Sequence, residues 1–301
     1  MKIKHLKNPY KIAFALSNRG LLNWLGDRPY LKLRYRGMMG KKLNLENPQT
    51  YTAKLQWMKL YDHNPAYPAL VDKYEVKKYV RKIIGEEYLI EDYGVWDHFD
   101  DIPLDKLPQS FVLKCTHDSG GMLICRDKSR LDPEEARIKM EKARKRSFFK
   151  LNREWPYKNV PSRILAERYM ENAATGDLRD YKFFCFDGVP RLMFVATERQ
   201  TPGVETKFDF FDMDYQHLDL VNGHPNAGKI PEKPQNFELM KELAAKLSRG
   251  IPHVRVDFYE VDGKAYFGEL TFFHFSGIVP FQPECWDRTL GDWLTLPPKQ
   301  V

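Results

Sequence analysis

The chain has 301 residues, 43% of them hydrophobic, which is ample for a packed core and argues against a disordered protein. It carries 48 basic and 41 acidic residues, so its formal net charge is +7. There is no apolar run of the roughly eighteen residues that a membrane span needs, and the basic start lacks the apolar stretch of a signal peptide, so we expect a cytoplasmic protein.

Residues 1–42 form a basic segment, with eleven Lys and Arg against the single acid Asp27. The segment also holds Trp24 and several leucines. Such an amphipathic stretch can lie on an anionic membrane at the inner face of the cell membrane, or hold a polyanionic substrate. The alternative, which the pattern favours, is a helix packed on the protein with its lysines in water.

The region 44–61 predicts a loop followed by a helix that is capped near Thr50. The candidates for burial on this helix are Leu55, Met58 and Leu60. The segment 72–84 predicts a second, basic helix, which carries Lys73.

Residues 111–115 and 122–125 predict two β-strands joined by a glycine-bearing loop. Asp132 can then cap a helix whose first position Pro133 occupies. The stretch 137–158, with nine basic residues, looks helical and favours a solvated face or a funnel for an anionic substrate. No aromatic-interleaved or zinc-finger pattern accompanies it, so no nucleic-acid partner is expected.

The rest of the chain predicts antiparallel hairpins and one covering helix. The expected strands are 163–170, 181–186, 191–197, 207–211, 254–260 and 265–272. The helix 236–248 would cover one face of the sheet that most of them form. The fold class expected from this order is α+β.

The four cysteines lie far apart, and no pair has the C-x-x-C spacing of a zinc knuckle. Their spread does not suggest a disulfide framework either. We predict buried free thiols at Cys115, Cys125, Cys185 and Cys285.

The strongest local signal lies on the last hairpin, with Arg255 and Asp257 on one strand and Glu269 and Thr271 on its partner. Because alternate residues share a face of a strand, each pair points the same way. Pairing about the turn can place Asp257 beside Glu269, which is unfavourable without an intervening cation. Hard oxygen ligands suit Mg²⁺ that bridges to phosphate. The alternative is a solvated face on which Asp257 pairs with a lysine.

The glycine loop offers a second signal, because Lys114 lies on the strand just before it. Successive N–H groups at Ser119, Gly120 and Gly121 can cradle phosphate oxygens, with Lys114 as a nearby positive charge. The alternative is a simple hairpin turn. The pattern matches neither a P-loop nor a dinucleotide-binding fingerprint.

The order of these signals resembles the ATP-grasp superfamily, and within it the TupA-like family, typified by the teichuronopeptide biosynthesis protein and found in capsule and O-antigen clusters. The resemblance covers nearly the whole chain. The motifs that carry it, in order, are Leu45-Glu46-Asn47-Pro48, Asp72-Lys73-Tyr74, Gly85-Glu86-Glu87-Tyr88-Leu89, Phe267-Gly268-Glu269-Leu270-Thr271-Phe272 and Leu290-Gly291-Asp292.

The resemblance implies an ATP-grasp fold, in which two α+β subdomains clasp ATP. We expect a helical, basic N-terminal region at 1–105. A lid subdomain with the glycine loop would follow at 106–166, and a C-terminal subdomain with the metal site at 167–301.

By the same resemblance, Lys114 is the lid lysine on the ATP phosphates and Lys73 a further nucleotide-side lysine. The loop that closes over the phosphates contains His117, Ser119, Gly120 and Gly121. The hinge that binds the adenine edge through its backbone contains Glu167, Arg168 and Tyr169. Asp180 and Lys182 are further candidates for nucleotide contacts, the alternative for each being a surface charge.

The acids Asp257 and Glu269 resemble the ligands of two Mg²⁺ ions. Thr271 stands where the superfamily commonly has Asn, which makes the second metal site the less certain one. Arg255 would stabilise the acyl phosphate and tetrahedral intermediate, because a fixed guanidinium grips oxyanions bidentately. The candidates for substrate contacts are Lys207, His274, Ser276 and Gly277.

The activity implied is an ATP-dependent carboxylate–amine ligase that works through an acyl phosphate. The carboxylate would belong to a uronic acid of a capsular, O-antigen or cell-wall polysaccharide or its precursor, and the amine to an amino acid or amino sugar. Two rivals stay open: a metal-dependent sugar-nucleotide glycosyltransferase, suggested by Asp212-Met213-Asp214, and a non-catalytic nucleotide- or polyanion-binding protein, suggested by Thr271.

Overall fold

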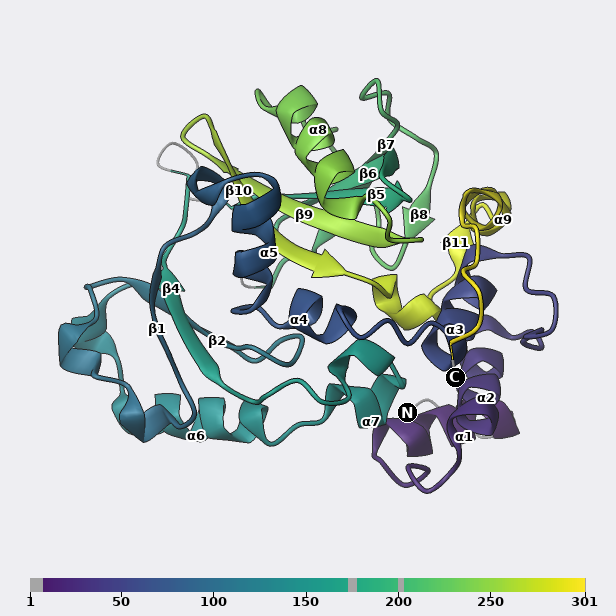
Figure 1. Cartoon of the computed structure of the whole chain (residues 1–301), viewed down its shortest axis with the longest axis horizontal. Coiled ribbons are helices and arrows are strands. Elements are labelled where there is room, and N and C mark those ends of the chain that lie inside the picture. The colour runs from purple at the N-terminus through teal and green to yellow at the C-terminus, as the bar shows by residue number, and fades with distance from the viewer. Residues whose placement is uncertain (1–7, 173–177, 200–202, 301) are drawn as a thin grey trace.

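The computed structural model describes residues 8–172, 178–199 and 203–300. Within these residues the chain is an α+β protein built on two antiparallel sheets (Figure 1). Helix α5 (Val76–Ile83) touches both halves: Lys77 pairs with Glu167 of the first sheet, while the Tyr79 hydroxyl donates to the Leu247 carbonyl under the second, at 2.9 Å.

The first sheet has the strand order β1-β4-β2-β3. Its strands are β1 (Asp92–Trp96), β2 (Phe111–Cys115), β3 (Met122–Cys125) and β4 (Ile164–Arg168). Helix α6 (Pro133–Arg144) packs on it through Ala136, Met140 and Ala143, and Asp132 caps the helix as predicted. Strand β1 was not predicted, because its five half-buried residues show no alternation of apolar and polar side chains.

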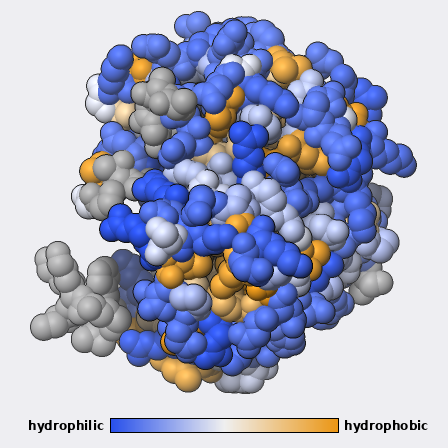
Figure 2. Space-filling model, turned by 90° about the vertical axis from the view of Figure 1, so that its left-hand side faces the viewer, coloured by the Kyte–Doolittle hydropathy of each residue, from blue (hydrophilic) through white to orange (hydrophobic). Residues whose placement is uncertain are grey.

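The face that carries this sheet and α6 is mostly hydrophilic, with separate apolar patches (Figure 2). The sheet takes β1 from before residue 106 and β4 reaches past 166. The predicted subdomain boundaries at residues 106 and 167 therefore stay a prediction. Strands from both sides of the first boundary belong to one sheet.

The second sheet has the order β10-β9-β5-β6-β7. Its strands are β5 (Asp180–Phe186), β6 (Val189–Thr197), β7 (Lys207–Phe211), β9 (Val254–Val261) and β10 (Lys264–Thr271). A small sheet pairs β8 (Val221–Asn222) with β11 (Phe281–Gln282). The hairpins expected from the sequence are confirmed.

All seven residues of β5 are buried because both faces of the sheet are covered. On one face, Phe183 packs against Phe237 of helix α8 (Phe237–Ser248), with ring centroids 6.0 Å apart. On the other, Phe184 packs against Tyr51 of helix α3 (Tyr51–Tyr61) at 6.2 Å. Burial of each such ring stabilises the fold by about 1.5–3 kcal/mol.

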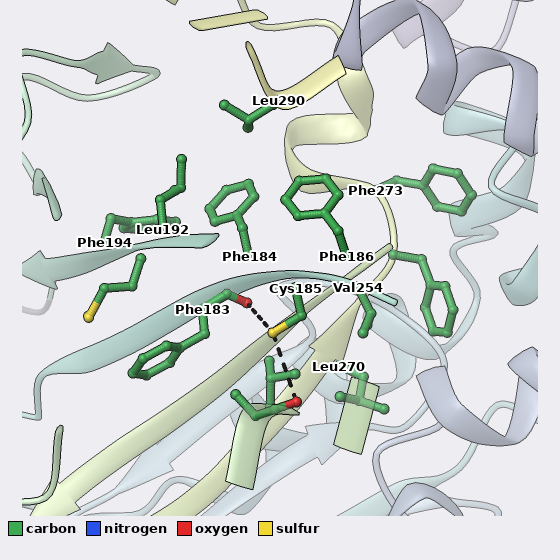
Figure 3. Packing of buried hydrophobic residues seen from close by; sticks show 14 of the residues in the cluster. Phe183, Phe184, Cys185, Phe186, Leu192, Phe194, Val254, Leu270, Phe273 and Leu290 are labelled. Atoms are coloured by element: carbon green, nitrogen blue, oxygen red, sulfur yellow. Dashed lines mark hydrogen bonds between the residues drawn. The ribbon is translucent and has the colours of Figure 1, made fainter. Parts of the chain in front are cut away.

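Figure 3 shows the same core from close by, with Cys185 between Phe184 and Phe186. The thiol faces the carbonyls of Phe183 and Ala244 at 3.7 and 3.9 Å. The free, buried thiols expected at Cys115, Cys125 and Cys185 are confirmed, whereas Cys285 is free but exposed.

Three helical predictions need correction. Within the segment 72–84 the helix starts later than predicted: α5 begins at Val76, after a turn that contains Lys73 and follows α4 (Tyr67–Val71). The basic stretch 137–158 is also broken, because α6 ends at Arg144 and Ser147 caps the short α7 (Phe148–Asn152). On α3, Leu55 and Met58 are fully buried but Leu60 is only half-buried.

The N-terminal helices α1 (Pro9–Asn18) and α2 (Asp27–Met39) pack together and against the body. Arg34 of α2 donates to the Ser17 hydroxyl at 2.6 Å. The turn between them leaves Leu21 59% and Trp24 79% exposed. The last helix along the described chain is α9 (Cys285–Trp293). No helix in the described ranges has the length and hydrophobicity to cross a bilayer.

The remaining helical segments are short 3-10 turns. They are η2 (Glu86–Tyr88), η3 (Phe99–Asp101), η4 (Leu104–Lys106), η5 (Lys128–Arg130), η6 (Trp155–Tyr157) and η7 (His274–Gly277). Two of them, η6 and η7, border the site described next.

Candidate active site

A cavity of about 460 Å³ opens between the second sheet, the glycine loop and the segment from α7 to η6. Its walls bring together eight of the residues singled out in the sequence. These are Lys73, Ser119, Lys182, Arg255, Glu269, Thr271, His274 and Ser276. Six aromatic residues also line it: Phe148, Tyr157, Phe194, Phe208, Phe273 and Phe275.

Strand register creates the charged wall of the cavity. Asp257 of β9 lies directly opposite Glu269 of β10 on one side and Lys182 of β5 on the other. The predicted pairing of the two acids is thus confirmed. The register shifts beside Gly268, whose added Cβ would lie 3.1 Å from the Asp257 carbonyl, so the close approach of these strands favours glycine.

Two cations neutralise Asp257. Arg255 donates to both carboxylate oxygens, at 2.7 Å each, and Lys182 donates to Oδ2. The carboxylate is 1% exposed and does not line the cavity. Asp257 therefore orients the two cations.

Glu269 differs because its side chain is 43% exposed and lines the cavity. Its Oε1 lies 3.5 Å from Arg255. Partial burial alone would raise the pKa of Glu269, but the positive charges of Lys73 and Lys182, with those of Arg255 and Arg199, lower it to about 2. The carboxylate is ionised at neutral pH. We call Lys182, Arg255, Asp257 and Glu269 the cavity cluster.

His274 sets the direction of Arg255. The Arg255 guanidinium donates to His274 Nδ1 at 2.7 Å, and Nε2 lies 2.9 Å from Asn222 Oδ1. Burial and the charge of Arg255 lower the pKa of His274 well below its usual range, so the ring is neutral and Nε2 carries the proton. His274 is nearly buried at the cavity wall, where it orients the arginine.

Thr271 completes the arrangement. Its hydroxyl accepts from Arg255 at 3.0 Å and faces Glu269 Oε1 at 3.4 Å. Downstream, Phe275 and Ser276 both have left-handed backbone, with φ of 45° and 55°. Such conformations in non-glycine residues cost energy and concentrate at functional sites.

Two side chains at this wall, Glu269 and Thr271, offer oxygen ligands that fit Mg²⁺. Glu269 offers a partly exposed carboxylate, and Thr271 an adjacent hydroxyl, while Asp257 is engaged by its two cations. A magnesium ion that is shared with phosphates and waters needs only one or two protein carboxylates. No cluster of three His, Cys, Asp or Glu residues suited to a metal occurs among the described residues.

A second charged group lies within the first sheet. Glu167 of β4 forms ion pairs with Lys77 at 2.6 Å and with Lys114 at 2.5 Å, and Lys77 also pairs with Asp92. Burial opposes ionisation of Glu167, but the two lysines lower its pKa to about 2. We call Lys77, Lys114 and Glu167 the sheet cluster. None of its members lines the cavity.

Tyr259 lies between the two clusters. Its pKa is raised by burial, and the charges of Glu269, Asp257 and Glu167 all act on it. The ring packs beside Ile90, Met170 and Val261, which form a small apolar group where the two sheets meet.

The glycine loop is tied to the turn that contains Lys73. The Lys73 N–H donates to the Thr116 carbonyl at 3.1 Å, and its ammonium donates to the Asp118 carbonyl. Gly120 needs its glycine because φ is +95°. The Gly121 N–H donates to Asp118 Oδ1 at 3.1 Å, so it is already engaged within the loop.

Other predicted residues lie outside the cavity wall. His117 Nε2 lies 3.0 Å from the Arg146 carbonyl. Asp180 is buried and pairs with Lys182 at 3.5 Å and with Arg199. Gly277 packs against Gln56 of α3.

The remaining predicted residues are peripheral. Arg168 is exposed, and the Tyr169 hydroxyl donates to Glu171 at 2.6 Å while it accepts from Arg126. Lys207, at the start of β7, lies 3.8 Å from Glu205. The Asp212-Met213-Asp214 motif forms a turn, in which Asp212 Oδ1 accepts from the backbone of Asp214 and Gln216.

Several site residues escaped the sequence reasoning. Lys77 lies between Val76 and Val80 on the buried side of α5, and a lysine there was the available signal. Arg199, Asn222 and Glu154 belong to segments with no recognisable motif, and only the folded chain brings them to the site.

Solved structures similar to this chain have low identity. The D-alanine–D-alanine ligase of Bacillus anthracis complexed with ATP is 17% identical, over 70% of this chain and 57% of that chain, with a TM-score of 0.42. The ATP-grasp ligase PsnB complexed with minimal precursor, Mg and ADP is 10% identical, over 86% and 66%, with a TM-score of 0.39. This chain thus spans little more than half of the first ligase. No curated protein matches.

A family comparison is decisive. The family described as TupA-like ATPgrasp matches residues 53–295, which is well over half of the chain and includes both charged clusters. This chain belongs to the TupA-like ATP-grasp family.

Proposed function

We propose that the protein is an ATP-dependent ligase that activates a carboxylate as an acyl phosphate and joins it to an amine. The observation that carries the proposal is Arg255, a guanidinium that Asp257 and His274 hold in place at a cavity wall shared with Lys182 and Glu269. Membership of an ATP-grasp family supports the use of ATP.

In the proposed reaction, a substrate carboxylate attacks the γ-phosphate of ATP, and ADP leaves. The chain contributes positioning and charge neutralisation, which dominate catalysis of phosphoryl transfer. Lys73 and Lys182, which both line the cavity, would neutralise the developing negative charge. Arg255 then stabilises the oxyanion that forms when the amine attacks the acyl phosphate. Glu269 and Thr271 would hold Mg²⁺, whose chemistry is to neutralise and orient the phosphates.

The sheet cluster is the proposed nucleotide side of the site. Lys114 and Lys77 provide positive charge next to the hinge after β4, where Glu167 to Tyr169 would bind the adenine edge through backbone groups. The loop from His117 to Gly121 would close over the phosphates. Glu167 keeps both lysines in position until nucleotide binds.

The proposed carboxylate is a uronic acid of a capsular, O-antigen or cell-wall polysaccharide or its precursor, and the proposed amine belongs to an amino acid or amino sugar. The family resemblance supports this class. The aromatic lining of the cavity, with Phe194, Phe208 and Phe275, offers apolar surface for a ring-shaped substrate.

The proposed location is the cytoplasm, with contact to the inner face of the membrane through the N-terminal helices. Trp24 and Leu21 are exposed on the α1–α2 turn, and Lys11 is exposed on α1. Lys2, Lys4 and Lys7 lie outside the described residues. Replacement of Trp24 by Ala should reduce sedimentation with phosphatidylglycerol vesicles. Equal binding to neutral vesicles, or no binding by the parent, would contradict the contact.

The main experiment measures ADP and phosphate release with Mg-ATP, glucuronic-acid oligosaccharides and a panel of amino acids. Glu269→Gln should lower turnover about 100-fold or more because it removes charge from the cavity wall, and Asp257→Asn should do the same because it releases Arg255 and Lys182 from their orientation. Exposed Glu134→Gln is the matched control. Consumption of a UDP-sugar without ADP release would instead indicate a glycosyltransferase. ATP binding without turnover by the parent would indicate a non-catalytic nucleotide-binding protein.

A further inference from the structure

The segment from α7 to η6 forms part of the cavity wall. Phe148, Asn152, Glu154 and Tyr157 of this segment line the cavity. Glu154 is only 3% exposed. A buried carboxylate at a cavity wall requires a partner, since an unpaired charge in a low-dielectric site is costly.

The cations nearest to Glu154 do not fill this need. The Lys59 ammonium donates to the Ser276 carbonyl at 2.8 Å, the Ser276 hydroxyl at 2.6 Å and Gln56 Oε1 at 3.2 Å, which uses its three protons. Arg34 donates to Ser17 and Asn18 of the N-terminal helices. Within the described residues, Glu154 Oε1 receives no hydrogen bond.

Contacts with the N-terminal helices fix the segment from α7 to η6, so the unpartnered Glu154 Oε1 does not result from a loose loop. Arg153 pairs with Asp27 at 3.0 Å and lies 4.3 Å above the Tyr30 ring. The Tyr30 hydroxyl donates to the Leu151 carbonyl at 2.9 Å. These contacts clamp α7 and Glu154 against α2, and they give the N-terminal helices a role in the cavity.

The surroundings of Glu154 suit a cationic ligand. Phe148 and Tyr157 lie side by side with ring centroids 4.8 Å apart, and aromatic faces attract ammonium groups. Arg255 and Lys182, which suit an anion, line the same cavity. One cavity therefore combines cations that suit an anion with a carboxylate that has an unpartnered acceptor oxygen.

We infer that Glu154, with the rings of Phe148 and Tyr157, binds the ammonium group of the amine substrate and accepts its proton; this inference rests on the proposed ligase function. Transfer of one proton from the ammonium to the Glu154 carboxylate leaves a neutral amine. Its nitrogen lone pair then forms the C–N bond with the acyl phosphate, and the C–O bond to phosphate breaks. The second proton of the amine leaves with the phosphate.

The protonation behaviour of Glu154 is consistent with this role. Burial raises its pKa to about 7, against the opposing effects of Lys59, the Ser276 hydroxyl and Arg34. Two other titratable groups lie beside Glu154: burial lowers the pKa of the Lys59 ammonium to about 7, and burial raises the pKa of Tyr157 well above its usual range. The raised pKa of Glu154 favours uptake of a proton from a bound ammonium group, while Tyr157 stays neutral.

The test compares two nucleophiles in the parent and in Glu154→Gln. Amino acids carry an ammonium group, whereas hydroxylamine is largely uncharged at neutral pH and traps an acyl phosphate as a hydroxamate. With Mg-ATP and glucuronic-acid oligosaccharides, Glu154→Gln should raise KM for the amino acid about 10- to 100-fold, the usual effect of losing a charge-assisted hydrogen bond. KM for ATP and the rate of hydroxamate formation should stay within about twofold.

Controls separate this role from a structural one. Glu134→Gln, on the exposed face of α6, should leave both nucleophiles unaffected, and Glu154→Asp should retain part of the preference for the ammonium substrate. If Glu154→Gln lowers the melting temperature and slows both nucleophiles equally, Glu154 is only a structural partner of Lys59 and the inference is wrong. If the parent forms no ATP-dependent hydroxamate, the proposed ligase function itself fails.

Discussion

The cavity cluster and the sheet cluster use the same electrostatic device in two settings. Each places a glutamate among lysines or arginine, and each lowers the pKa of that glutamate to about 2. They differ in exposure, because the side chain of Glu269 is 43% exposed and that of Glu167 is 5% exposed. The first can therefore be reached by a ligand from the cavity, while the second is closed within the sheet until its lysines are drawn away.

The comparison teaches that a lowered pKa does not by itself identify an active site. Buried ion pairs perturb pKa values for structural reasons as well. The two clusters differ because the cavity cluster contributes residues to a cavity wall, whereas the sheet cluster does not. Variants of each should therefore divide into those that affect catalysis and those that affect stability.

The largest effect is expected at Arg255. Arg255→Met should lower kcat/KM by about 10³-fold or more, because it removes the fixed oxyanion donor and leaves Asp257 with Lys182 as its cation. Arg255→Lys should restore little, since lysine cannot match the two contacts to Asp257. Steady-state kinetics would measure this, with Arg288→Met, an exposed arginine of α9 outside the proposed site, as the control. Retention of activity in Arg255→Met would refute the proposed role.

Next comes the stability of the sheet cluster. Glu167→Gln should lower the free energy of unfolding by about 3–5 kcal/mol, because two lysines lose their shared buried carboxylate. Denaturant titration would measure it. Glu269→Gln, in the open cluster, should leave the midpoint nearly unchanged while it reduces turnover. Equal destabilisation by the two variants would remove the distinction between the clusters.

A third prediction concerns the loss of folding stability at low pH. Because the pKa of folded Glu167 is about 2 and lies below the value of 4.5 for an unperturbed glutamate, its stabilisation is present above about pH 4.5. It is lost as the pH falls through the folded pKa. The parent should thus lose about 3 kcal/mol more stability than Glu167→Gln between pH 5 and pH 2. Parallel pH profiles of unfolding free energy would contradict this assignment.

The smallest effect is expected at the predicted hinge. Tyr169→Phe removes a hydroxyl whose partners, Arg126 and Glu171, lie at the surface. Surface interactions of this kind contribute at most about 1 kcal/mol. If the hinge binds adenine through its backbone, KM for ATP should change less than about twofold. A large rise would mean that the Tyr169 side chain contacts the nucleotide.

The helix and strand positions that could be predicted from the sequence were those with a local physical signal. Side chains alternate at the start of β9, and a turn joins it to β10; β2 and β3 are short apolar runs around a glycine-bearing loop. Helix α6 has Asp132 and Pro133 at its start. The predicted helix start at Asp72 was wrong because the Lys73 N–H bonds with the distant Thr116 carbonyl, and the helix α5 begins only at Val76.

The sequence by itself determined the α+β class, the hairpin that pairs Asp257 with Glu269, and the family resemblance, because each depends on residues close together or on the order of motifs. Only the tertiary structure decided which charged residues meet. Glu154 reaches the cavity of Arg255, and Lys77 reaches Glu167, across long stretches of chain. Side-chain burial and partners at such separations depend on packing, which no local pattern encodes.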